Sequence, residues 1–197
     1  MNMDLNRTEE LLAFIGESPT PYHAVAAVER RLLAEGFVRL HEAEHWELAA
    51  GQGYYVVRGG TSLLAFRVQR PDFTNFQTVL CHSDSPCLRI KENGQMTALK
   101  RYARVNVEKY GGLLMAPWLD RPLSAAGRVA LETENGLEER LVDFDRDLML
   151  IPHVAIHMDR KANEGKKYEV QKDLLPLYGQ DLAGDTFMTQ LAELAGC

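Results

Sequence analysis

The chain has 197 residues, of which 46% are hydrophobic and 25% are charged. This composition excludes disorder along the whole chain, because enough apolar side chains are present to offset the entropy lost on folding. The formal net charge is −6, and no block of lysine and arginine residues occurs. We therefore expect neither nucleic acid nor an anionic membrane to be the partner of this protein.

The sequence carries no targeting signal that we recognise. The first residues, MNMDLNRTEELLAF, include early acidic side chains and lack the apolar region of a signal peptide. No run of about 18 apolar residues occurs, so no membrane-spanning helix is expected. Cys81, Cys87 and Cys197 have no CxxC spacing, which favours buried free thiols in a reducing compartment. These features predict a cytoplasmic protein of one large domain or two small ones.

Two helices are predicted at the start of the chain. The first ends at Gly16 and at the Ser-Pro-Thr-Pro sequence of residues 18–21. The second is predicted over residues 22–35, with apolar side chains at three- and four-residue spacing and Gly36 just beyond its end. The apolar stripe of the first helix consists of Leu11, Leu12, Phe14 and Ile15.

Strand patterns follow the helices. Residues 54–58 and 62–68 flank Gly59-Gly60 and predict a hairpin. The apolar sequence FQTVLC, residues 76–81, predicts a third, buried strand that leads directly into His82-Ser83-Asp84. Open α/β sheets bind ligands beyond the carboxyl ends of their strands, so this position favours a functional role for the polar residues.

The second half of the chain has a different sequence pattern from the first. Alternating apolar and polar residues over 103–108 predict half-buried antiparallel strands. Asn135-Gly136 predicts the turn of a hairpin over residues 128–142. Residues 159–172 are charged and are predicted to form a loop, and Asp185 is predicted to cap a final short helix.

His82 and Asp84 are the first candidates for chemistry. Two residues apart in an extended segment, their side chains lie on the same side of the chain. Imidazole is a common metal ligand, and a nearby carboxylate can fix its tautomer. An isolated His-x-Asp pair is also compatible with a histidine in a local hydrogen bond, or with a metallophosphoesterase. The carboxylate-rich ligand set of a metallophosphoesterase is not visible.

Other candidate pairs are less convincing. His153 and His157 have the spacing of a helical metal-binding pair, but Pro152 and the β-branched residues that follow disfavour a helix. Glu138 and Glu139 are adjacent in the predicted hairpin, so their side chains would point to opposite faces. We interpret these two glutamates as solvated charges.

Six short strings of residues are distributed over nearly the whole chain. They are Ser18-Pro19-Thr20-Pro21-Tyr22-His23-Ala24, His82-Ser83-Asp84-Ser85-Pro86-Cys87-Leu88-Arg89, Tyr110-Gly111-Gly112, Trp118-Leu119-Asp120-Arg121, Ala126-Gly127-Arg128-Val129 and Ile151-Pro152-His153-Val154-Ala155-Ile156-His157. In this order they resemble the M18 family of metalloaminopeptidases, of the aspartyl aminopeptidase type. Each string alone has little specificity, whereas the ordered set is highly specific.

The resemblance implies an α/β fold class. Residues 1–86 would form the N-terminal part of the three-layer α/β catalytic domain of a zinc peptidase. Residues 87–197 would form a β-rich domain that is inserted into the catalytic one, mediates oligomer contacts and is truncated here. The change in the pattern of apolar and polar residues near Cys87 agrees with this boundary.

The resemblance also implies an activity, which is zinc-dependent release of N-terminal residues, preferably acidic ones, from peptides. His82 matches the first ligand of a site for two zinc ions, and Asp84 matches the catalytic-site acid that orients this histidine. His157 matches a substrate-binding histidine that reaches the active site of a neighbouring subunit. A homo-oligomer and a peptide substrate are therefore expected.

The chain departs from the family pattern in its ligand set. The bridging aspartate, a Glu-Glu pair, a further aspartate and a late histidine of the family have no counterpart, and Glu138-Glu139 lacks the flanking residues of that pair. Pro122 stands where the family usually carries an acid. Since a catalytic zinc usually has three protein ligands, we interpret the chain as an N-terminal portion that is inactive alone. The alternative is a non-catalytic assembly module derived from such an enzyme.

Overall fold

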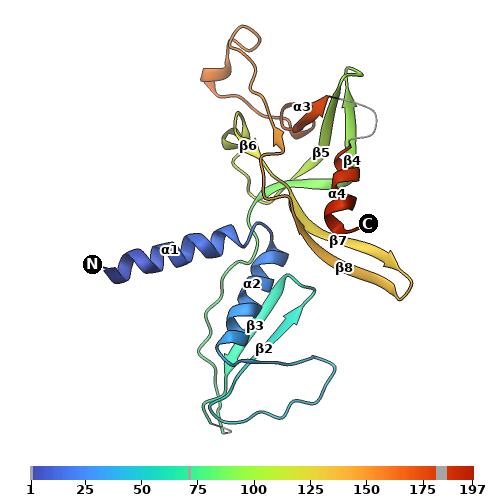
Figure 1. Ribbon diagram of the computed structural model, residues 1–197. Helices are drawn as coiled ribbons and strands as arrows, with labels where there is room; N and C mark the ends of the chain where they lie inside the picture. The colour runs from blue at the N-terminus through green and yellow to red at the C-terminus, as the bar shows by residue number, and fades with distance from the viewer. Residues whose placement is uncertain (1, 71, 181–185) are drawn as a thin grey trace. The chain divides into compact units, whose positions relative to one another are not determined.

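The computed structural model describes residues 2–70, 72–180 and 186–197 (Figure 1). The chain divides into two units, Met1–Ser85 and Pro86–Cys197. Both helices and sheets are present, which confirms the mixed α/β fold class. The functional roles expected for the two parts stay predictions.

The first unit combines two helices with a small sheet. Its elements are α1 (Asn2–Gly16), α2 (Pro21–Ala34), β1 (Val38–Arg39), β2 (Gly53–Arg58) and β3 (Ser62–Arg67). The strands pair in the order β1-β2-β3, with β1 parallel and β3 antiparallel to β2. The hairpin predicted around Gly59-Gly60 is confirmed, and both glycines have positive φ angles of 60° and 70°.

The start of α2 is fixed by local chemistry. The Thr20 side chain caps the helix by accepting a hydrogen bond from the His23 backbone N–H at 3.3 Å. Pro21 occupies the first turn, where its missing N–H has no intrahelical partner to lose. Gly36 follows the helix with a φ of 76°, so the predicted end of the helix is also confirmed.

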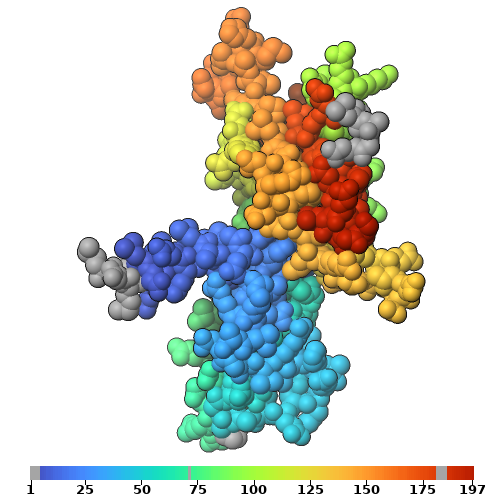
Figure 2. All heavy atoms as spheres, in the orientation of Figure 1, coloured from blue at the N-terminus to red at the C-terminus, as the bar shows by residue number. Residues whose placement is uncertain are grey.

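Helix α1 forms as predicted, but its apolar stripe is largely exposed. Leu11, Leu12 and Ile15 are all exposed, while Phe14 is half-buried beneath the guanidinium of Arg31, whose Cζ lies 4.7 Å from the ring centroid. Figure 2 shows α1 projecting from the rest of the first unit. The core of this unit instead consists of Val25, Ala27, Tyr54, Tyr55, Val56 and Val68.

The strand predicted over residues 76–81 is wrong. This segment has no regular secondary structure, and Figure 1 draws it without a strand arrow. Val79 and Leu80 are 92% and 89% exposed. An apolar run becomes a strand only where a neighbouring strand accepts its backbone hydrogen bonds, and no described strand pairs with this one.

The second unit is built on a five-stranded sheet and a separate hairpin. Its sheet has the order β4-β5-β10-β9-β6, and β7 pairs only with β8 among the described strands. The elements are β4 (Cys87–Ala98), β5 (Tyr102–Tyr110), η1 (Ala116–Trp118), β6 (Pro122–Leu123), β7 (Ala126–Thr133), β8 (Gly136–Asp143), β9 (Met149–Leu150), η2 (Ala162–Glu164), α3 (Val170–Asp173), β10 (Leu177–Gln180) and α4 (Phe187–Ala195).

Strand β5 lies between β4 and β10 and confirms the predicted antiparallel strand. Ala103, Val105 and Val107 are buried on one face, while Arg104 and Asn106 are half-buried on the other. The hairpin predicted at Asn135-Gly136 is also confirmed, as β7 and β8. In the predicted loop over 159–172, the structure adds the short helices η2 and α3.

Helix α4 closes the core of the second unit. Phe187, at its start, stacks on Phe144 and meets Tyr178 edge to face, with ring centroids 5.7 and 5.9 Å away. The predicted capping residue, Asp185, lies outside the described residues. The observed cap is Thr186, whose side chain accepts a hydrogen bond from the Thr189 N–H at 3.1 Å.

Two further predictions concern the cysteines and the membrane. All three cysteines are free, but Cys81 and Cys197 are exposed and Cys87 is only half-buried, so the expectation that they are buried is wrong. Cys81 is the last residue of the unpaired segment 76–81, so no described strand covers it. None of the helices in the described part of the chain is long and apolar enough to cross a membrane.

We expect Phe187→Ala to lower the free energy of unfolding of the second unit by about 3–5 kcal/mol, because it removes a buried ring and leaves a cavity. Leu137→Ala, on the exposed hairpin, is the matched control and should change this free energy by less than about 0.5 kcal/mol. Urea titrations of both variants provide the measurement. Equal midpoints would contradict the assignment of Phe187 to the core.

Candidate functional site

The His82–Asp84 pair forms a defined contact in the first unit. The His82 Nδ1 atom lies 2.8 Å from Asp84 Oδ1, which confirms that residues two apart in this segment point to the same side. The His82 side chain is 91% exposed and that of Asp84 is 33% exposed. The histidine is therefore oriented by its carboxylate partner and open to solvent on its other side.

The segment that carries the pair is anchored to the β2–β3 hairpin. Ser83 Oγ donates a hydrogen bond to the Thr61 carbonyl at 2.7 Å, and Thr61 follows the Gly59-Gly60 turn. The predicted position beyond the carboxyl end of a buried strand is therefore wrong. A tight turn, rather than a strand, places His82 and Asp84 in the described structure.

The pair has the donor chemistry of one metal ligand. With Nδ1–H donated to Asp84, the neutral form of the His82 imidazole has its lone pair on Nε2, which faces away from the carboxylate. Neutral imidazole nitrogen suits zinc well. Among the described residues, no group of three or more histidines, cysteines, aspartates and glutamates could hold a metal ion. His82 thus fits zinc as a single ligand, and this part of the chain does not supply a full set.

His157, the third predicted site residue, belongs to the second unit and is exposed. It lies in a turn that is closed by hydrogen bonds from Met158 N–H to Ala155 O at 2.8 Å and from Asp159 N–H to Ile156 O at 3.2 Å. The helix that His153 and His157 would need to form a metal-binding pair is absent from this described segment.

Two of the sequence strings meet through Asp120. Its N–H donates to Ile151 O at 2.9 Å, and its Oδ1 accepts the His153 N–H at 2.8 Å. Asp120 has a φ of 54°, a left-handed conformation that aspartate adopts more readily than most residues. Pro122 is tolerated because β6 is an edge strand of the sheet. The contact links residues 118–121 to the segment that leads to His157.

Lys166 fixes the other end of the His157 segment. Its Nζ lies 3.2 Å from Asp159 Oδ2 and 3.6 Å from Asp173 Oδ1. The hydrogen bond to Asp159 and the nearby Asp173 raise the pKa of Lys166. Sequence reasoning missed this arrangement, although the alternating charges of residues 159–173 were its signal.

The glutamates at 138 and 139 are the solvated charges that the hairpin predicted. Glu138 pairs with Arg140 and Glu139 with Arg128, and both glutamates are exposed. The hydrogen bond from Arg140 lowers the pKa of Glu138. Neither carboxylate therefore has the environment of a catalytic acid.

Comparison with known proteins assigns the chain to a family. Residues 14–190 match the family model described as aminopeptidase I zinc metalloprotease (M18). A probable M18 family aminopeptidase 2 of Pseudomonas paraeruginosa is 45% identical over 187 residues, which cover 94% of this chain and 43% of the relative. The chain belongs to the M18 family.

Solved structures agree with this assignment. Ape4 in its complex with Nbr1 has a TM-score of 0.87 and 36% identity, covering 95% of this M18 chain and 38% of that chain. The S. cerevisiae mApe1 dodecamer shares the fold, with a TM-score of 0.69 and 23% identity over 95% of this chain and 43% of that one. The M18 chain therefore spans less than half the length of the relatives that it matches, and its fold corresponds to an N-terminal portion of the peptidase.

We expect Asp84→Ala to change the tautomer of His82 in the M18 chain. Without the carboxylate, the proton should leave Nδ1 for Nε2, the position that an unconstrained imidazole prefers. The ¹⁵N chemical shifts of the His82 ring report this change directly. Asp72→Ala, which removes an exposed acid elsewhere in the first unit, should leave the His82 shifts unchanged. An unaltered tautomer in the Asp84 variant would refute the orienting role.

We expect Lys166→Met to loosen residues 152–169, detected as faster amide hydrogen exchange. Lys167→Met is the matched control, because Lys167 is exposed and forms no ion pair with a described residue. The pKa of Lys166 is raised in the folded state, so its ion pairs stabilise the segment below the ordinary lysine pKa of about 10.4. This stabilisation should disappear as the pH rises through the raised value. Equal amide hydrogen exchange of residues 152–169 in both variants would contradict the anchoring role of Lys166.

Proposed function

We propose that this chain supplies part of the active unit of a zinc-dependent aminopeptidase that releases N-terminal, acidic residues from peptides. The observation that carries the proposal is the 2.8 Å contact between His82 and Asp84 in a chain of the M18 family. The complete enzyme would hold two zinc ions in its site and work in the cytoplasm. The metal ligands that the described residues lack would come from the remaining length of the enzyme.

In this proposal, His82 offers its Nε2 atom as a zinc ligand. Asp84 accepts the Nδ1–H, which fixes the tautomer that leaves Nε2 free for the metal and holds the ring in one orientation. When bound, zinc lowers the pKa of a water molecule and polarises the scissile carbonyl. The exposure of His82 leaves room for the remaining ligands and for the peptide.

His157 would contact the substrate in the active site of a neighbouring subunit. Its exposure and its position on a turn that is tied down by Asp120 and Lys166 support this role. The dodecameric state of S. cerevisiae mApe1 supports a homo-oligomer. A hydrogen bond from the His157 ring to the oxygen that gains negative charge would lower the barrier of the reaction.

The exposed apolar residues of the first unit support the need for the rest of the enzyme. Phe76, Val79 and Leu80 form an extended run with unpaired backbone groups, and α1 exposes Leu11 and Leu12. Val79 and Leu80 are adjacent and almost fully exposed, and adjoining exposed apolar residues favour an interaction site. In the proposed enzyme, strands from the remaining length would pair with residues 76–81.

A chimera tests this function. The 187 matched residues of the P. paraeruginosa relative are replaced by this chain, and release of aspartate and of leucine from aminoacyl substrates is compared. We expect chelator-sensitive activity with a preference for aspartate, whereas this 197-residue chain alone should be inactive. His82→Ala should abolish activity together with loss of zinc.

The same chimera separates the two histidines of the second unit. His157→Ala should lower turnover by about 10²–10³-fold while zinc content and oligomeric state stay intact. His153→Ala is the control, since it should act mainly through folding. Activity of the isolated chain, or equal turnover of the His157 variant and its parent, would contradict the proposal. A folded, zinc-loaded but inactive chimera would favour the assembly module.

A further inference from the structure

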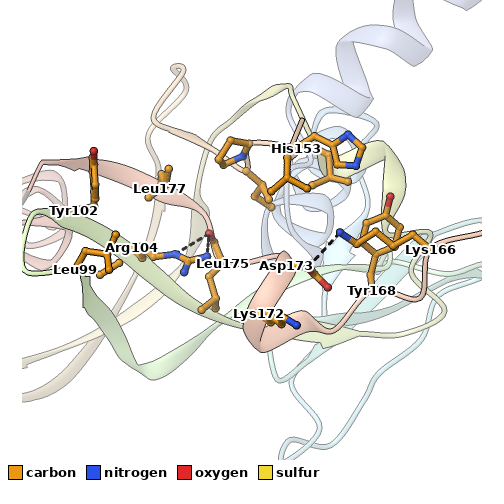
Figure 3. Close-up of a pocket in the computed structure, with 15 residues that line it drawn as sticks. Leu99, Tyr102, Arg104, His153, Lys166, Tyr168, Lys172, Asp173, Leu175 and Leu177 are labelled. Carbon is orange, nitrogen blue, oxygen red and sulfur yellow. Dashed lines mark hydrogen bonds and ion pairs between the residues drawn. The ribbon is translucent and has the colours of Figure 1, made fainter. Parts of the chain in front are cut away.

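A pocket of about 290 Å³ lies entirely within the second unit (Figure 3). Its walls come from the β4–β5 hairpin, the segment after β9 and the region of α3, and its accessible apolar side chains include those of Val154 and Leu177. A water molecule occupies about 30 Å³ of the liquid. The pocket therefore has the size for a small organic molecule.

The charges around this pocket differ from those of the whole chain. Of the described residues that line it, Arg104, Lys166 and Lys172 are cationic, whereas Asp173 is the only acid. In Figure 3, the Arg104 side chain extends from β5 and the Lys172 side chain from α3. The pocket is thus cationic although the chain carries a net charge of −6.

Arg104 provides a partly desolvated positive charge, and its guanidinium has more N–H donors than the two that bind the Leu175 carbonyl. Its Nε and Nη2 atoms donate to the Leu175 carbonyl at 3.3 and 3.0 Å, and burial lowers the pKa of the guanidinium. A guanidinium has five N–H donors, so the edge turned away from Leu175 keeps unused ones. No carboxylate of the described residues forms an ion pair with Arg104.

The single acid of the pocket is already engaged. Asp173 Oδ2 accepts the Glu169 N–H at 2.8 Å, and Asp173 Oδ1 lies 3.6 Å from Lys166 Nζ. Lys166 also pairs with Asp159, so its charge is balanced within the His157 segment. Lys172 is exposed and has no ion pair with a described carboxylate. The unbalanced positive charge of the pocket therefore comes from Arg104 and Lys172.

We propose that this pocket binds a small organic carboxylate, with one carboxylate group between Arg104 and Lys172 and its carbon chain against Val154 and Leu177. Planar carboxylates match the fork of a guanidinium and accept two hydrogen bonds from it. The accessible apolar lining favours an organic anion over inorganic phosphate, which would gain nothing from burial against it. The residues that line the proposed site do not include His82, Asp84 or His157.

Binding is tested with glutarate on the 197-residue chain, followed through the Nε–H signal of Arg104 by NMR and through titration calorimetry. Glutaramide, its neutral analogue, and inorganic phosphate are the comparison ligands. We expect saturable binding of glutarate, a weaker effect of phosphate and none of glutaramide on the Arg104 signal.

Variants assign the binding to the two cations. Lys172→Met should weaken glutarate binding about two- to fivefold, the range for a partly exposed ion pair. Arg104→Lys, which keeps the charge but loses the fork, should weaken it about tenfold. Lys109→Met is the control, because Lys109 is exposed on β5 and does not line the pocket. If the Arg104 variant folds poorly, the affinity of the Lys172→Met variant for glutarate still tests the proposal.

Four results would overturn the proposal: no saturable change at Arg104, an equal response to glutaramide, equal affinity of the Lys172 and Lys109 variants, or phosphate binding as tightly as glutarate. The first would exclude a ligand at this pocket and the second would make it a purely apolar cavity. The third would remove Lys172 from the site. The fourth would replace the organic carboxylate by a general oxyanion.

Discussion

Strand pairing is the constraint on which the rest of this structure depends. Strand β5 is paired on both sides, by β4 and β10, and its inward side chains form the core against which Phe187 packs. Residues 76–81 have a more apolar sequence, without a charged residue, but no described partner strand, and they stay irregular and exposed. The backbone N–H and C=O groups of a strand need partners as much as its side chains need burial. An apolar sequence alone therefore does not produce a strand where no partner strand lies beside it.

The candidate metal ligand depends on short-range geometry. His82 and Asp84 meet because side chains two residues apart share one side of an extended segment, and Ser83 ties that segment to the turn before β3. This arrangement requires neither a buried strand nor a complete domain. It prepares one imidazole for zinc, while a full ligand set needs carboxylates and histidines from elsewhere.

The second unit depends on polar contacts between segments that are distant in sequence. Asp120 holds the start of the His157 segment, and Lys166 holds its end through two aspartates. Arg104, beside them, donates to the carbonyl of Leu175 instead of pairing with an acid. Lys166, balanced by two aspartates, ties down the His157 segment, whereas Arg104 forms no ion pair with a described acid and contributes positive charge to the pocket.

The sequence by itself determined the features that short-range chemistry controls. The Thr20–Pro21 start of α2, the glycine turns of the two hairpins and the two-residue spacing of His82 and Asp84 all act within a few residues. The ordered strings also indicated the M18 family, which the comparisons confirm. Only the tertiary structure decided that residues 76–81 stay unpaired, that Asp120 joins Ile151 and His153, and that Arg104 and Lys172 face one pocket. Those outcomes depend on which distant segment comes alongside, and no local propensity encodes that choice.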